Sequence, residues 1–129
     1  DLFGQDKLVK DIEQSDLTEA DLNYLLKGAV QCTPSMKDKA GRLVVCHFGG
    51  FFGDNHPFSS ARVSWFVMES AFRRDDAAQR KGMVLVLYLA GILSMTHAMK
   101  ELFYATCTKI NRSLPMRHAA AHLCYSLPQ

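Results

Sequence analysis

The stretch Gly82-Met83-Val84-Leu85-Val86-Leu87-Tyr88-Leu89-Ala90-Gly91 decides the fold of this 129-residue chain. Between its two glycines it carries no charge, and its one polar side-chain atom is the Tyr88 hydroxyl oxygen. A helix needs about 20 apolar residues to cross a bilayer, so the run is too short for a membrane span. Valine and leucine between glycines are typical of a strand buried on both faces. Such strands belong to parallel or mixed sheets covered by helices, so the run predicts an α/β domain.

Helix and strand signals around this run complete a βαβαβ order. Thr18 and Asp21 form a capping-box pattern at the start of a short first helix, which Gly28 is expected to end. The remaining predicted elements are a strand over residues 43–48, a helix over 60–74, a helix over 95–112 and a strand over 116–125. Parallel strands are joined by right-handed helical crossovers. We therefore expect a mixed, mainly parallel sheet with crossover helices, preceded by a short helix.

The composition is that of an ordinary globular domain. The chain is 48% hydrophobic and 22% charged, so disorder is not expected. The net charge of +2 is too small to indicate a nucleic-acid partner. Residues 1–26 hold seven acidic residues against two lysines, a net charge of −5, which leaves +7 for the rest. We therefore distinguish an acidic helical segment, residues 1–28, from a domain over residues 29–129. The basic character of that domain fits either an anionic membrane surface or a solvated face.

The cysteines indicate a reducing compartment. Cys32, Cys46, Cys107 and Cys124 are scattered without a Cys-x-x-Cys pair, and residues 1–26 do not resemble a secretory signal. A cytoplasmic protein is the inference from this pattern. Because the chain starts with aspartate rather than methionine and stops soon after a strand-like segment, we interpret it as a fragment of a longer protein.

Motifs for nucleotide binding, metal binding or catalysis are weak, and we predict no enzyme activity, no metal and no cofactor. The glycine-rich loop over residues 49–53 has neither dinucleotide-binding nor P-loop spacing. His118 and His122 share a strand face, but no third ligand of suitable spacing stands nearby except a cysteine two residues on. Cys46 and His47 are adjacent in a strand, so their side chains point to opposite faces and cannot easily share a proton.

Four motifs, in order, resemble the CRAL-TRIO lipid-binding domain family. The first is an Asp-x-x-Gly-Arg segment that leads into the first core strand, at residues 38–45, and the second is an Asp-Pro turn before the first helix of the core, at residues 54–57. The third is a Gln-Arg-Lys-Gly segment that leads into the apolar strand, at residues 79–82, and the fourth is a Leu-Pro-Met-Arg segment before the last strand, at residues 114–117. The similarity runs from about Lys27 to Pro128, and the later part of the family's domain would lie beyond this chain. Leu43 stands where the family has proline, and Tyr88 where it usually has aspartate.

The resemblance implies a mixed sheet that forms the floor of an apolar pocket with helices as its walls. Such domains hold a single lipid, for example a phosphoinositide, a tocopherol or a retinoid, and carry it between membranes or present it. It thus implies a lipid ligand in place of a cofactor, and transient association with a membrane surface from the cytoplasm. Carried over position by position, the lipid-binding residues are Trp65, Met68, Met83, Leu85, Leu87, Phe103, Ile110 and Leu114.

Two alternatives stay open from the sequence. The same large apolar side chains also fit a filled core, which would make the domain a non-catalytic scaffold or regulatory module that binds a protein partner. A hydrolase-like α/β enzyme that uses a cysteine or a histidine is the other alternative. Glu69, on the same stretch of helix, either meets a polar head group or is exposed. A truncated domain is expected to hold half a pocket with an exposed apolar wall.

Overall fold

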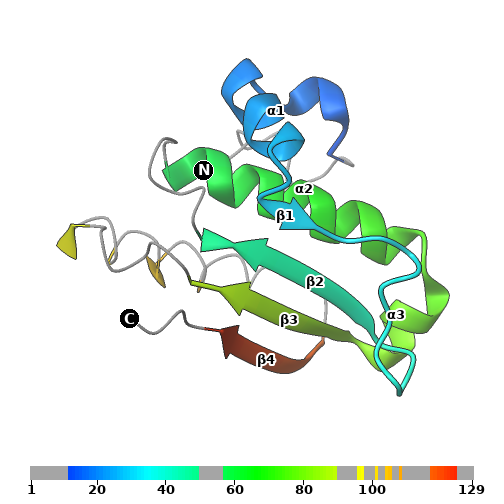
Figure 1. Ribbon diagram of the computed structural model, residues 1–129. Helices are drawn as coiled ribbons and strands as arrows, with labels where there is room; N and C mark the ends of the chain where they lie inside the picture. The colour runs from blue at the N-terminus through cyan, green and yellow to red at the C-terminus, as the bar shows by residue number, and fades with distance from the viewer. Residues whose placement is uncertain are drawn as a thin grey trace.

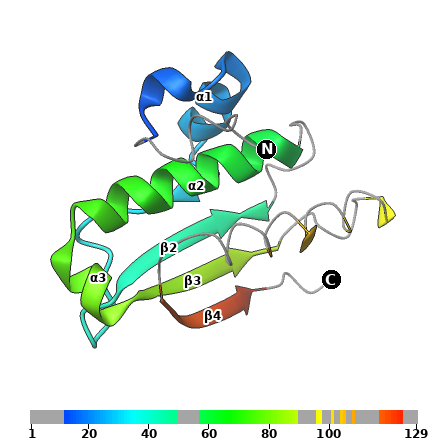
Figure 2. The same ribbon diagram turned by 180° about the vertical axis from the view of Figure 1, so that it is seen from behind.

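The computed structural model describes residues 12–49, 57–89 and 117–124, together with positions 96, 97, 101, 104, 105 and 108. In chain order the elements are η2 (Gln14–Asp16), α1 (Glu19–Leu26), β1 (Val30–Gln31), β2 (Leu43–Phe48), α2 (Pro57–Arg73), α3 (Asp76–Lys81), β3 (Met83–Tyr88) and β4 (His118–Cys124). The architecture is α/β, as the sequence predicts. Helices α1 and α2 lie on the same face of a four-stranded mixed sheet (Figures 1 and 2).

The sheet has the order β1-β2-β3-β4. β2, β3 and β4 are parallel, whereas β1 pairs antiparallel with β2. The three parallel strands lie within the predicted strand segments, and β2 coincides with its predicted bounds. The antiparallel β1 adds a short edge strand that the sequence pattern does not indicate. The mixed, mainly parallel sheet is therefore confirmed.

Gly82 allows β3 to start close beside β4. Its φ of 80° lies in the left-handed region, which residues with a side chain rarely adopt. A Cβ atom at this position would stand 2.3 Å from the carbonyl oxygen of Arg117, which accepts a hydrogen bond from the Met83 amide at 2.9 Å. A glycine is thus required where the apolar run enters the sheet.

The first helix begins as its capping pattern predicts. The Thr18 hydroxyl accepts a hydrogen bond from the Asp21 amide, and the Asp21 carboxylate accepts one from the Thr18 amide. α2 begins three residues before the predicted helix and ends one residue earlier. The sequence pattern predicts no element over residues 76–81, where the structure has α3. The Asp75 side chain caps α3 by accepting a hydrogen bond from the Ala78 amide at 3.0 Å.

The core lies between α2 and the face of the sheet below it. Buried apolar side chains of both layers form one cluster, in which Val45 and Val63 are fully buried. α1 joins this cluster through Tyr24, whose hydroxyl donates a hydrogen bond to the Ser60 hydroxyl at 3.3 Å. The described part of the acidic N-terminal segment therefore shares its core with the sheet.

Some predicted features lie outside the described residues. The predicted helix over residues 95–112 is largely among them, although positions 97, 101, 104, 105 and 108 are helical. The loop over residues 49–53, apart from Gly49, and Cys107 also lie outside the described part of the chain.

Candidate functional site

Five of the eight predicted lipid-binding residues are described, and the structure brings all five together. Met68 of α2 and Met83 and Leu85 of β3 are buried members of one cluster. Trp65 and Leu87 are half-buried and pack against that cluster. The other three, Phe103, Ile110 and Leu114, lie outside the described residues. The three buried side chains already fill the core, so Trp65 and Leu87 are the members of the five with surface left for a ligand.

The two flanks of α2 have different neighbours. Val67 and Arg74 line a pocket together with Cys32, which directly follows β1. At 100° per residue, Trp65 and Glu69 fall on the opposite flank of the helix. The strand order places β3 and β4 away from β1, so the flank of α2 that carries Trp65 and Glu69, called here the second flank, faces the β3–β4 side of the sheet.

Two polar atoms on this second flank are buried without a partner. The Trp65 indole Nε1 and the Glu69 Oε2 atom make no hydrogen bond within the described part of the chain. The other oxygen of Glu69, Oε1, accepts a hydrogen bond from Arg73 Nη2 at 2.5 Å. Glu69 is thus half-buried and paired rather than freely exposed. An unpaired buried polar group is costly, so such atoms commonly meet a water molecule or a ligand.

His47 of β2 lies on the same face of the sheet as Leu87 and is neutral at physiological pH. Burial lowers the pKa of His47 to about 4, and its Nε2 atom has no hydrogen-bond partner among the described residues. It stands opposite Leu87 in the β2–β3 register. The side chain therefore adds a neutral, partly unsatisfied group beside Leu87.

An apolar row leads from the core to the protein surface near the carboxyl ends of the strands. Leu87 of β3 is paired in register with Leu123 of β4. Leu123 is 52% exposed, which is high for a leucine in a strand. Tyr88, the last residue of β3, is 40% exposed on the opposite face of the sheet, where its ring centroid lies 6.3 Å from that of Phe48. Ligands of open α/β sheets bind beyond the carboxyl ends of the strands, which is where this row ends.

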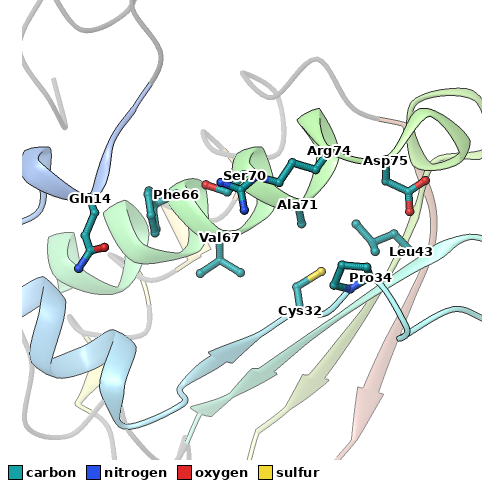
Figure 3. A pocket seen from close by; sticks show the side chains of 10 residues that line it. All are labelled: Gln14, Cys32, Pro34, Leu43, Phe66, Val67, Ser70, Ala71, Arg74 and Asp75. Carbon is teal, nitrogen blue, oxygen red and sulfur yellow. The ribbon is translucent and has the colours of Figure 1, made fainter.

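A pocket of about 380 Å³ occupies the first flank of α2, between that helix and the chain following β1 (Figure 3). The lining residues are Gln14, Cys32, Pro34, Leu43, Phe66, Val67, Ser70, Ala71, Arg74 and Asp75. None of them is a predicted lipid-binding residue. A signal was present in the sequence, because α2 carries a second apolar stripe that includes Phe66 and Val67. A helix with apolar residues on more than one flank is covered on more than one side.

The thiols of Cys32 and Cys46 are held protonated. Burial, the nearby Cys46 and Asp75 raise the pKa of Cys32 to about 11, and burial also raises the pKa of Cys46. Cys46 and His47 alternate between half-buried and buried along β2, as expected for neighbours on opposite faces. Among the described residues no group of three metal-ligating side chains comes together.

Comparison of the chain with family models, with curated proteins and with solved structures finds no match. The resemblance to the CRAL-TRIO family therefore stays a prediction from the sequence. Within the described ranges, no helix has both the length and the apolar content needed to cross a bilayer.

Proposed function

We propose that this chain is part of a non-enzymatic, CRAL-TRIO-like protein that binds a hydrophobic lipid along the second flank of α2, over the carboxyl ends of β3 and β4. The lipid would be carried between membranes or presented at a membrane surface facing the cytoplasm. The observation that carries the proposal is the apolar path from half-buried Trp65 and Leu87 to exposed Leu123.

The apolar path accounts for the lipid chain. Each methylene group removed from water contributes about 0.8 kcal/mol to binding. Leu87 and Leu123 stand side by side across β3 and β4, and part of their surface is free to contact a chain. A lipid placed there would cover apolar surface that otherwise faces water.

The buried polar atoms account for the polar end of the lipid. Trp65 Nε1 is a donor and Glu69 Oε2 is an acceptor, and neither has a partner within the described chain. Residues four apart on a helix are neighbours, so one group can reach both side chains. A hydroxyl accepts one hydrogen bond and donates another, which satisfies both atoms. Arg73 is already paired with Glu69, so this flank favours a neutral hydroxyl over a phosphate.

The experiment uses Trp65 as its probe, because it is the single tryptophan of the chain. Dibrominated octadecanol is titrated into the protein, with unbrominated octadecanol as the control ligand. Bromine quenches tryptophan on contact, so binding at this flank lowers the Trp65 emission with the brominated alcohol only. Absence of such quenching contradicts the proposal.

Three variants locate the binding site. Leu87→Asp and Leu123→Asp place a charge on the apolar path and are expected to abolish the quenching. Val86→Asp is the matched control, because Val86 is also half-buried on β3 but points to the opposite face. Far-UV circular dichroism checks that each variant is folded. Because Leu123 is exposed, Leu123→Asp is expected to fold even if the Leu87 and Val86 substitutions unfold the protein. Equal quenching in Leu123→Asp and the parent chain would refute the proposed path.

The alternative function is a scaffold or regulatory module that binds a protein partner. The burial of Met68, Met83 and Leu85 favours it, because these side chains already pack as a core. Extraction and mass spectrometry of the protein purified from cells separates the two functions. One lipid class near one-to-one occupancy supports lipid binding, whereas a folded protein without lipid supports the scaffold.

A further inference from the structure

We propose that the pocket on the first flank of α2 is a second, separate binding site, which takes a small amphiphilic carboxylate and pairs its anionic group with Arg74. It rests on the geometry of the pocket and does not depend on lipid binding at the opposite flank. The volume of about 380 Å³ falls within the range of about 300 to 1,000 Å³ that is typical of small-molecule sites.

The walls of the pocket suit an apolar body. Val67 and Ala71 point from α2 toward Cys32 and Pro34 on the facing chain, and Phe66 lies farther along the helix (Figure 3). The helix α2 and the chain following β1 are not joined by backbone hydrogen bonds in the sheet, so the space between their side chains stays open. A short aliphatic or aromatic group would contact both walls at once.

Within the described residues, the rim of the pocket carries one positive charge without a partner, that of Arg74. The exposed Arg74 side chain runs back along α2 toward Ser70 (Figure 3). No ion pair or hydrogen bond of Arg74 is formed with the rest of the described residues. The nearby Asp75 is already neutralised by Lys37, whose Nζ atom lies 2.6 Å from the Asp75 carboxylate.

This charge balance selects the class of ligand. A guanidinium group binds a carboxylate through two parallel hydrogen bonds. One free cation matches the single charge of a carboxylate better than the double charge of a phosphate monoester. The protonated Cys32 thiol adds no opposing charge to the wall. The Ser70 hydroxyl and the Gln14 amide, which also line the pocket, offer neutral hydrogen-bonding groups.

Isothermal titration calorimetry tests the proposal with three probes of one length: octanoate, octanol and octylamine. The full chain carries Leu123→Asp in these titrations, so that an alcohol bound at the opposite flank does not contribute to the heat. We expect octanoate to bind and the other two to bind at least about tenfold more weakly, because only octanoate forms a charge-assisted pair with Arg74. Arg74→Gln is expected to remove this preference. Arg80→Gln is the matched control, since Arg80 is an exposed arginine on α3 that does not line the pocket.

A second measurement does not depend on any variant. Octanoate bound in the pocket is expected to slow alkylation of Cys32 at high pH, measured by mass spectrometry of the peptide that contains it, and to leave the rate at Cys124 unchanged. Failure of octanoate to bind, equal binding of octanoate and octanol, or an unchanged Cys32 rate would each overturn the proposal. Because the Leu123→Asp substitution blocks the opposite flank in the titrations, none of these results bears on Trp65 quenching, and the two sites stand or fall separately.

Discussion

Replacement of Asp21 by alanine is expected to destabilise the protein more than any other change of an acidic residue in α1. Asp21 is fully buried, which is rare for a carboxylate. Arg62 Nε and Nη2 of α2 donate hydrogen bonds to its two oxygens at 2.7 and 2.8 Å. The Thr18 amide donates a third at 2.9 Å as part of the helix cap. One side chain therefore both starts α1 and fastens it to α2.

The size of the effect follows from these contacts. Removal of one partner of a buried ion pair costs about 3–5 kcal/mol, because the other charge is left uncompensated. The Arg62 side chain keeps 19% exposure and can turn toward water, which places the loss near the lower end of that range. Loss of a cap interaction adds about 1 kcal/mol. We expect the free energy of unfolding to fall by about 4 kcal/mol and the midpoint of thermal unfolding by roughly 15 °C.

Urea and thermal unfolding followed by circular dichroism measure this effect. Glu19→Ala is the control, because Glu19 is an exposed acidic residue in the same first turn, and its loss is expected to cost less than about 0.5 kcal/mol. A double-mutant cycle with Arg62→Met isolates the pair and should give a coupling of at least about 2 kcal/mol. If Asp21→Ala costs no more than Glu19→Ala, the pair does not fasten α1 to α2 and the reasoning fails.

Three further predictions concern pH, backbone and thiol chemistry. The pKa of His47 is about 4 in the folded protein and 6.5 in the unfolded chain, so the unfolded chain takes up a proton at His47 at a higher pH than the folded protein does. The free energy of unfolding should therefore fall by up to about 1.4 kcal/mol per pH unit as the pH drops from 6.5 to 4. Urea titrations of His47→Gln should lack this slope. Gly82→Ala should lower the free energy of unfolding by about 2–3 kcal/mol in urea titrations, because the added Cβ meets the Arg117 backbone. Gly41 also has a positive φ, but a Cβ there meets only the flexible end of Lys81, so Gly41→Ala should cost about 1 kcal/mol. Equal losses in the two variants would contradict this account. Because the pKa of Cys32 is about 11, its alkylation rate should keep rising well above pH 9, and a half-maximal rate near pH 8.5 would show that the thiol is not buried as described.

The strands and the first helix cap could be predicted because their signals are local. Six residues of alternating burial form β2, and an unbroken apolar run forms β3. The Thr18–Asp21 capping box needs no contact beyond its own turn. By contrast, β1 has only two residues and α3 has six, too few for a periodic pattern to emerge. The local signals available there were the Asp75 cap and the glycine at the end of α3, Gly82.

The candidate sites were less predictable, because they depend on which flank of a helix meets which strand. The sequence shows that Trp65, Met68 and Leu87 are apolar, and the structure brings these residues together. The sequence did not reveal that Met68 is sealed in the core while Leu87 keeps free surface. That difference comes from the lateral position of α2 over the sheet, which depends on the packing of both layers.

The sequence by itself determined the α/β class, the parallel strands and the start of the first helix, since backbone preference and apolar patterning act over a few residues. Only the tertiary structure decided that Asp21 is neutralised by an arginine 41 positions away and that Cys32 and Arg74 line one pocket. These residues belong to separate elements, and nothing in the local chain encodes the distance between them. Their meeting is set by how α1, α2 and the sheet pack, because burial of apolar surface is non-directional and specifies no partner until the whole core has formed.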